Sequence, residues 1–159
     1  MSRIKNLNFG AVILDMDGVI TKTARVHAQA WKKMFDEFLE KREGENFRPL
    51  DIKIDYNKYI DGIPRLDGIR GFLKSRNIDI PEGNPEDEPE KNTVHGLGKR
   101  KNKIFRDVIE KDGVQVYEDA LEMIKKWEKE NIKLAVISSS RNCKYIMEKT
   151  GLEDRFKVR

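Results

Sequence analysis

The segment Asp15-Met16-Asp17-Gly18 places two carboxylates two residues apart, directly after the apolar run 9–15. In an extended chain, side chains two residues apart point to the same side, so Asp15 and Asp17 can converge on one ligand. Close carboxylates repel one another, and a hard cation such as Mg2+ relieves that repulsion. One carboxylate can attack phosphorus while the other transfers a proton. Alone, such a tetrad is more often a plain turn; its place after a buried strand favours phosphoryl-transfer chemistry.

Two apolar runs and a set of helices must position these residues. Residues 9–15 and 132–137 predict buried parallel strands. Residues 23–41 carry apolar side chains at spacings of three and four, which predicts an amphipathic helix. Further helices are expected from residue 64 onward and over 101–110, 118–130 and 141–150, the last ended by Gly151. Residues 156–159 predict the opening of another strand.

This order of elements predicts an α/β fold with a parallel core. Residues 1–22 and 113–159 are expected to form the core, and residues 23–112, too long for a crossover, to contain a helical cap. Within it, residues 81–90 hold three prolines, five acids and no base. We expect the segment of about 81–91 not to pack and to form a mobile acidic loop.

Composition excludes several classes of function. Charged residues make up 38% of the 159 residues, and 32 bases against 28 acids give a net charge of +4. This excess is mild and dispersed, so no nucleic-acid partner is expected. No apolar stretch is long enough for a membrane span, and no signal peptide is recognised, so no membrane partner is expected. The single cysteine, Cys143, excludes an internal disulfide and suggests a cytoplasmic protein.

Several short motifs, in their order along the chain, resemble those of a known family. They are Asp15-Met16-Asp17-Gly18-Val19, Thr23-Ala24 with His27 to Trp31, Gly62-Ile63-Pro64-Arg65, Lys99-Arg100-Lys101-Asn102, and Leu134 to Ser138 followed by Ser139-Ser140-Arg141-Asn142. The combination resembles the haloacid dehalogenase (HAD) superfamily, and within it the β-phosphoglucomutase-like subfamily, including relatives linked to trehalose metabolism. The resemblance implies a HAD-like Rossmannoid α/β core, here incomplete, with an inserted α-helical cap.

The resemblance also implies an enzyme and roles for individual residues. Asp15 would be the nucleophile, Asp17 the general acid/base and Ser138 the hydroxyl that orients the phosphoryl group. Mg2+ would be bound by the Asp15 carboxylate and the backbone carbonyl of Asp17. The substrate- and phosphate-binding residues would be Ser138, Ser139, Ser140, Arg141, Asn142, Arg65, Lys101, Asn102 and His27. The implied reaction is Mg-dependent phosphoryl transfer on a sugar phosphate through an aspartyl phosphate, interconverting β-glucose 1-phosphate and glucose 6-phosphate.

Each implied binding residue has a plainer interpretation. Arg65 can be a solvated cap residue, and residues 138–142 a helix N-cap. Simple surface charge explains Lys101 and Asn102 equally well. His27 lies on the apolar stripe of its helix, so a packed or hydrogen-bonded histidine is favoured, while the resemblance allows a role near the cap hinge.

The later motifs of the family, a lysine and a strand-end acidic pair, find no match after Ser138. We therefore expect a chain cut short, with an open apolar sheet edge that could self-associate. Two alternatives to the mutase stay open. One is a sugar-phosphate phosphatase of the same superfamily; the other, of another class, is an inactive fragment or phosphate-binding module.

Overall fold

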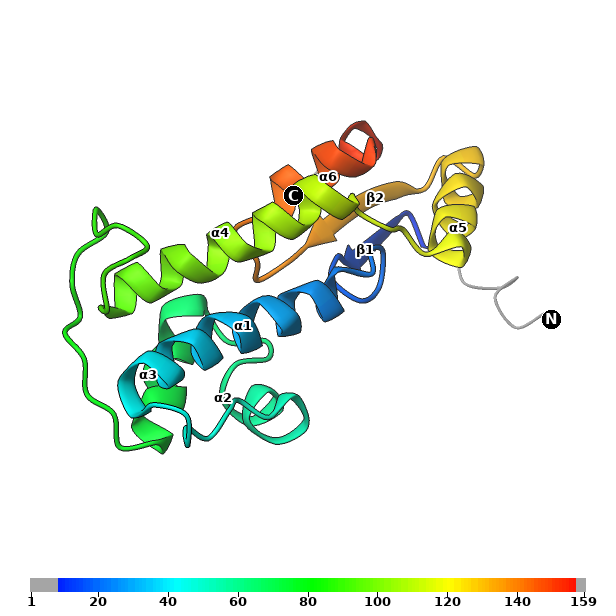
Figure 1. Ribbon diagram of the computed structural model, residues 1–159. Coiled ribbons are helices and arrows are strands. Elements are labelled where there is room, and N and C mark those ends of the chain that lie inside the picture. Colours follow the sequence, from blue (N-terminus) through cyan, green and yellow to red (C-terminus); the bar gives the residue numbers. More distant parts are fainter. Residues whose placement is uncertain (1–8, 157–159) are drawn as a thin grey trace. The chain divides into compact units, whose positions relative to one another are not determined.

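The computed structural model describes residues 9–156, which form two compact units (Figure 1). Residues 9–24 and 114–156 make up one unit, called the core unit here. Residues 25–113 make up the other, called the cap unit.

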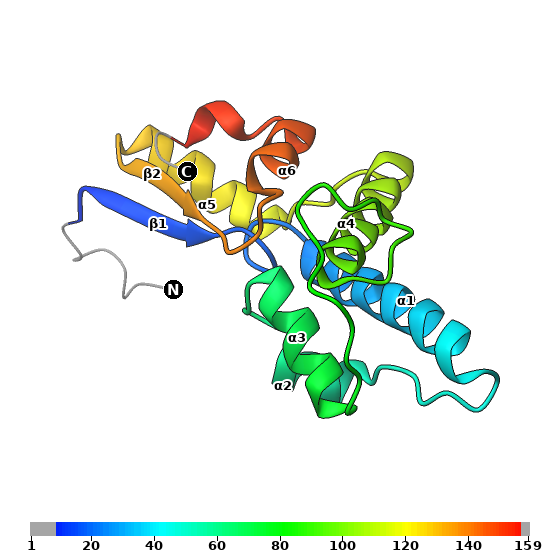
Figure 2. The same cartoon turned by 90° about the vertical axis from the view of Figure 1, so that its left-hand side faces the viewer.

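The core unit is built on two parallel strands, β1 (Ala11–Asp15) and β2 (Lys133–Ile137), which lie side by side in both ribbon views (Figures 1 and 2). Asp15 is in register with Ile137, so both strands end at the same edge. The helices of this unit are α5 (Glu118–Lys129), which packs against β2, and α6 (Cys143–Thr150), with a short turn η2 (Glu153–Arg155). The α/β class with parallel strands is thus confirmed.

The two faces of this sheet differ. Leu134 and Val136 point to one face and are buried. Ile13 and Ile137 share the opposite face with Asp15 and are 65% and 59% exposed. Parallel sheets are normally covered on both faces, so this exposed apolar face is unusual.

The cap unit is helical. Its elements are α1 (Thr23–Glu43), the short turn η1 (Ile52–Tyr56), α2 (Asn57–Tyr59), α3 (Arg65–Ser75) and α4 (Val94–Asp112). The apolar stripe predicted for residues 23–41 is confirmed: its side chains are buried with those of α3 and α4. This core contains Trp31, Met34, Phe35, Phe38, Leu39, Leu50, Ile60, Ile69, Phe72, Leu73, Ile78, Val94 and Leu97.

Helix α4 begins seven residues before the predicted start at 101. Thr93 is its N-cap, and the Thr93 side chain accepts a hydrogen bond of 3.0 Å from the Gly96 N–H. Gly96 and Gly98 weaken the helical signal of this turn, because glycine is a poor helix former. The strand expected at 156–159 lies outside the described residues apart from Phe156, which is buried.

The acidic segment is irregular, but the expectation that it does not pack is wrong at Asp87. The Asp87 side chain is buried and accepts hydrogen bonds from Thr93 Oγ1 (2.8 Å), Lys91 Nζ (2.9 Å) and the Asn84 N–H (3.2 Å). A carboxylate with this many donors is stable away from water. Asp87 therefore ties the segment to the start of α4. The mobility of the segment stays a prediction.

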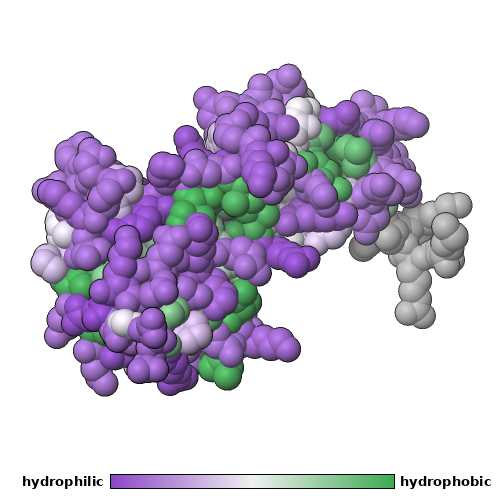
Figure 3. All heavy atoms as spheres, viewed as in Figure 1, coloured by the Kyte–Doolittle hydropathy of each residue, from purple (hydrophilic) through white to green (hydrophobic). Residues whose placement is uncertain are grey.

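The surface agrees with the charged composition. The face seen in Figure 3 is mainly hydrophilic, with apolar side chains gathered in smaller patches. No helix within residues 9–156 is long and apolar enough to cross a membrane.

Candidate active site

The chain turns sharply after β1 and carries Asp17 on that turn. The Met16 carbonyl accepts hydrogen bonds of 3.0 Å from the N–H groups of both Ile20 and Thr21. Gly18 lies in the left-handed region at φ 84° and its N–H donates to the Thr21 carbonyl (2.8 Å). A side chain at this φ would be strained, so the glycine after the second aspartate is what allows the turn.

Asp17 is half-buried and held at both carboxylate oxygens. Thr23 Oγ1 donates a short hydrogen bond to Oδ1, and Ser138 Oγ donates one of 3.1 Å to Oδ2. Thr23 Oγ1 in turn lies 2.6 Å from Thr21 Oγ1, whose hydroxyl also reaches the Met16 carbonyl at 3.2 Å. These contacts fix the direction of the Asp17 side chain.

Asp15 lies beside this network. It is the last residue of β1, is exposed, and is in register with Ile137, the residue before Ser138. Asp15, Asp17 and Ser138 therefore gather at the carboxyl ends of the two parallel strands, where α/β proteins bind their ligands.

In the segment between β2 and α6, two serine hydroxyls accept hydrogen bonds from backbone N–H groups two residues further along the chain. Ser138 Oγ accepts from the Ser140 N–H (3.0 Å), and Ser140 Oγ accepts from the Asn142 N–H (3.2 Å). Asn142 is buried, whereas Ser139 and Arg141 are exposed. The predicted anion-binding residues thus stand on the approach to a helix N-terminus, a favourable place for phosphate.

The donors at this edge suit Mg2+ in kind. The Asp15 carboxylate and the Asp17 carbonyl are hard oxygen ligands, and Mg2+ is often bound by one or two carboxylates together with substrate phosphate and water. Within residues 9–156 no group of three or more His, Cys, Asp or Glu side chains could hold a metal ion. The described residues therefore offer only part of a Mg2+ coordination shell.

In the cap unit, Arg65 is bound to α4. Its Nη2 donates to Asn102 Oδ1 (3.0 Å) and its Nη1 to the Gly98 carbonyl (3.4 Å). Arg65 and Asn102 are both half-buried, so neither is a fully solvated residue.

Lys101 and His27 form a second cluster in the cap unit. Lys101 is 2% exposed, so the interpretation as surface charge is wrong for this residue. Its Nζ lies 2.7 Å from His27 Nδ1 and 5.0 and 5.3 Å from the ring centres of Phe105 and Trp31. An ammonium group donates this hydrogen bond to Nδ1 when the His27 ring carries its proton on Nε2. The expected hydrogen-bonded and packed histidine is confirmed, stacked on Phe105 at 4.1 Å.

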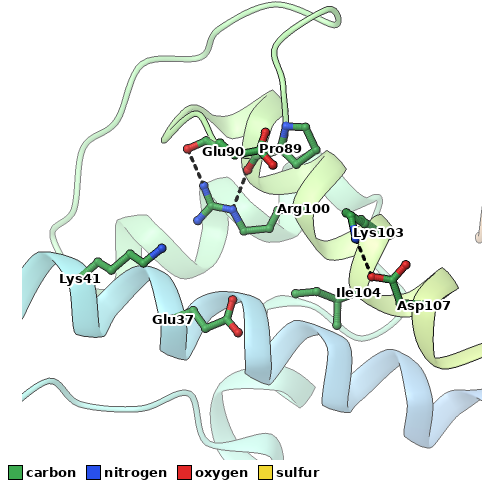
Figure 4. A pocket seen from close by; sticks show the side chains of 8 residues that line it. All are labelled: Glu37, Lys41, Pro89, Glu90, Arg100, Lys103, Ile104 and Asp107. Carbon is green, nitrogen blue, oxygen red and sulfur yellow. Dashed lines mark hydrogen bonds and ion pairs between the residues drawn. The ribbon is translucent and has the colours of Figure 1, made fainter.

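A pocket of about 250 Å³ lies elsewhere in the cap unit, between α1, the acidic segment and α4 (Figure 4). It contains none of the predicted site residues. Arg100 lines it and donates hydrogen bonds to the carbonyls of Pro89 (2.6 Å) and Glu90 (3.0 Å). Burial lowers the pKa of Arg100 from its usual value, and the neighbouring Glu37 and Glu90 oppose this. The remaining lining residues are Lys41, Lys103, Ile104 and Asp107.

From the sequence, Thr21 and Thr23 have no predicted part in the site; Thr23 enters only within the Thr23-Ala24 motif of the family resemblance. The signal was present: two hydroxyl residues, two apart, directly follow the Gly18 turn. Only the fold shows that the Thr23 hydroxyl reaches back to Asp17.

The chain is similar to several known proteins. A beta-phosphoglucomutase of Mycobacterium tuberculosis is 44% identical over 149 residues, which cover 92% of this chain and 56% of that protein. A protein of the same organism named as an uncharacterized glycosyl hydrolase is 33% identical over 151 residues, 93% of this chain but 11% of that protein. The crystal structure of beta-phosphoglucomutase from Clostridium difficile matches with a TM-score of 0.72 at 24% identity, covering 94% of this chain and 60% of that one.

The chain thus spans little more than half the length of the phosphoglucomutases it matches. The model of one protein family, haloacid dehalogenase-like hydrolase, matches residues 9–159. With the Asp-x-Asp turn after β1 and the serine after β2 in hydrogen-bond contact, the chain belongs to the haloacid dehalogenase-like hydrolase family.

Proposed function

We propose that the protein is a Mg2+-dependent phosphotransferase that acts on a sugar phosphate through an aspartyl phosphate, as a β-phosphoglucomutase interconverting β-glucose 1-phosphate and glucose 6-phosphate. The observation that carries this proposal is the hydrogen bond between Asp17 and Ser138, which joins the first motif to the second across 121 residues. The 44% identity to a beta-phosphoglucomutase supports this reaction over others.

The residues of the core unit suit the proposed chemistry. The exposed Asp15 carboxylate would attack phosphorus, forming an O–P bond as the bond to the leaving sugar oxygen breaks. Asp17 would give its proton to that oxygen and recover it in the reverse step. Bound Mg2+ would neutralise charge on the phosphoryl oxygens. Ser138 has one hydroxyl proton, with which it donates a hydrogen bond to Asp17 Oδ2 here. Donated to a phosphoryl oxygen instead, this hydrogen bond would orient the phosphoryl group and would no longer occupy Asp17 Oδ2.

The remaining predicted residues are proposed as substrate ligands. Ser139, Ser140, Arg141 and Asn142 of the core unit would bind phosphate. In the cap unit, Arg65 would bind the phosphate that stays on the sugar, because a guanidinium fits phosphate with two parallel hydrogen bonds. Lys101, His27 and Asn102 would complete the substrate-binding groups of that unit.

The test is an assay of the purified chain with Mg2+ and β-glucose 1-phosphate, beside the M. tuberculosis beta-phosphoglucomutase. We expect glucose 6-phosphate to form in a reaction that a metal chelator stops. We expect turnover slower than in the relative, because the described residues hold only part of a metal shell. The Asp15→Asn variant should bind glucose 6-phosphate yet form no product. Undiminished turnover by this variant would rule out the aspartyl phosphate.

The same assay separates the alternatives. Release of inorganic phosphate without glucose 6-phosphate would show a phosphatase. Binding without any turnover would favour the phosphate-binding module, a candidate supported by the absence of a three-ligand metal group within residues 9–156.

A further inference from the structure

The pocket of the cap unit that contains none of the predicted site residues has a highly charged wall (Figure 4). Six of its eight lining residues are charged: three are bases, Lys41, Arg100 and Lys103, and three are acids, Glu37, Glu90 and Asp107. Pockets for apolar ligands are lined mainly by hydrophobic and aromatic side chains. Because polar groups dominate this wall and its formal charges cancel, the pocket suits a polar ligand without net charge.

Each of the two helices that line the pocket contributes charges of both signs. Glu37 and Lys41 lie one turn apart on α1. Lys103 and Asp107 lie one turn apart on α4, where their side chains form an ion pair of 2.8 Å. Acids and bases are therefore interspersed around the wall. An anion would lie close to carboxylates in this pocket, and a zwitterion would find no separate positive and negative sides.

The Arg100 guanidinium is fixed in the wall by hydrogen bonds to uncharged acceptors. Its Nε donates to the Pro89 carbonyl (2.6 Å), and its Nη2 donates to the Glu90 carbonyl (3.0 Å) and to Asn92 Oδ1 (3.2 Å). Among the residues that the structure describes, Nη1 makes no hydrogen bond, so two N–H donors stay open to a ligand. Figure 4 shows the Lys41 side chain extending towards this guanidinium.

The pocket also offers open acceptors and a small apolar surface. Within residues 9–156, neither the Glu90 carboxylate nor the Lys41 ammonium group forms a hydrogen bond or an ion pair. Ile104 packs against the apolar core of the cap unit while lining the pocket, and Pro89 lines it from the acidic segment. A ligand in this pocket thus meets donors, acceptors and apolar carbon together.

We propose that this pocket binds an uncharged polyhydroxy compound of the size of one monosaccharide. A hydroxyl group both donates and accepts, so neighbouring hydroxyls would donate to Glu90 and accept from Lys41 and Arg100. The pocket volume of about 250 Å³ lies below the roughly 300–1,000 Å³ of pockets for drug-sized ligands, which suits a single sugar ring. The C–H face of the ring would pack on Ile104. The inference does not depend on the proposed function, because the pocket contains none of the residues proposed to bind the sugar phosphate.

The test is an NMR titration of the full chain with glucose, followed through the backbone amide signals. We expect the amides of Glu90, Arg100 and Ile104 to shift in a saturable manner. The dissociation constant should be of the order of 1 mM, because a ligand this small gains little binding free energy. Inorganic phosphate, an anion, and alanine, a zwitterion, are titrated in parallel at matched ionic strength. They should leave these amides unchanged at the same concentrations.

Two variants each remove one proposed partner of the ligand. Lys41→Met and Glu90→Gln should each weaken glucose binding about three- to tenfold, the usual effect of losing one charge-assisted hydrogen bond. The control for the first is Lys74→Met, because Lys74 lies in the last turn of α3 as Lys41 does in α1. The control for the second is Glu88→Gln, in the same acidic segment but outside the pocket. All four residues are exposed, so thermal unfolding should change little in every variant.

Three results would overturn the inference. The first is that glucose shifts none of the amides around the pocket. The second is that phosphate or alanine shifts them at the same or lower concentrations, which would show a site for a charged ligand. The third is that Lys41→Met and Glu90→Gln bind glucose as well as their controls do, which would show that the proposed hydrogen bonds are not made. Turnover of the sugar phosphate is measured separately, so its failure would leave these results as they stand.

Discussion

At the scale of single residues, the burial of Lys101 lowers the stability of the cap unit relative to an apolar residue at the same position. Its ammonium group is 2% exposed and contacts the His27 ring and the faces of two aromatic rings. Removing an ammonium group from water costs free energy, and aromatic faces and an imidazole lone pair are weaker partners for it than water. If packing were the only requirement at position 101, an apolar residue would be expected there.

We therefore predict that Lys101→Met separates stability from function. The free energy of unfolding should be kept or raised by about 1 kcal/mol, since apolar residues of similar volume often replace buried charges without loss. Sugar-phosphate binding should fall about tenfold. The measurements are denaturant unfolding and calorimetry. Lys103→Met is the control: Lys103 is an exposed partner of Asp107 at 2.8 Å, and both quantities should change little. A marked loss of stability in Lys101→Met would contradict this view.

At the scale of elements, the acidic segment is fastened to α4 by a compact group around Asp87. Gly83 lies at φ 72°, and a methyl group there would lie 2.1 Å from Asp87 Oδ2 and 2.5 Å from Thr93 Oγ1. Gly83 thus meets two demands at once, a left-handed backbone and space for the hydrogen bonds of Asp87.

Two glycine variants distinguish these demands. Gly44 also has a positive φ, 78°, but nothing lies within 4 Å of a methyl group there. Gly44→Ala should cost about 1–2 kcal/mol, the usual price of a left-handed alanine. Gly83→Ala should cost clearly more, about 3 kcal/mol or above, because buried hydrogen bonds must also rearrange. The measurement is urea unfolding. Equal losses of unfolding free energy in the two variants would contradict the prediction, because they would show that the methyl group at position 83 is accommodated without disturbing the hydrogen bonds of Asp87.

The Asp87 group also predicts how stability depends on pH. Hydrogen bonds from Lys91 and then Thr93 lower the pKa of Asp87 from its usual 3.8 to about 2. A carboxyl whose pKa is lower in the folded state stabilises the fold above pH 4, and this contribution is lost as the pH falls from about 4 to about 2.

The comparison of wild type with Asp87→Asn reveals this contribution. Thermal unfolding midpoints measured from pH 7 to pH 2 should differ between the two proteins above pH 4 and converge below it. A difference that stays constant across this range would show that ionisation of Asp87 has no part in holding the segment.

At the scale of the whole molecule, one face of the β1–β2 sheet is apolar and exposed, where parallel sheets are normally covered on both faces. Ile13 and Ile137 lie on this face and are each more than half exposed, and within residues 9–156 the sheet has only these two strands, so both of its edges are unpaired there. Such surfaces associate in water because burying them removes apolar area from solvent.

We predict that the chain self-associates as its concentration rises, which sedimentation velocity would detect. Ile13→Lys and Ile137→Lys should each shift the equilibrium towards the monomer. Val19→Lys is the control, because Val19 is 45% exposed but lies in the turn outside the sheet. A monomer at all concentrations, or equal effects of the three variants, would contradict association through this face.

The local features of this protein follow from short stretches of its sequence. The Asp-x-Asp-Gly tetrad after an apolar run, the stripe of residues 23–41 and the helix end at Gly151 depend on periodicity and on backbone preferences within a few residues. Those preferences act in any context, so the strands, most helices and the place of the Asp15 and Asp17 pair after the first strand could be predicted. Boundaries failed where glycines weakened the signal, as at the start of α4.

Which distant groups come into contact depends on the tertiary structure. The bond of Ser138 to Asp17 spans 121 residues, that of Arg65 to Asn102 spans 37, and Lys101 reaches His27 across 74. Lys101 and Asp87 are likewise buried in the structure, although their sequence context had suggested exposed charges. These outcomes depend on how helices pack and which donors a fold brings within 3 Å, and no local pattern encodes that geometry.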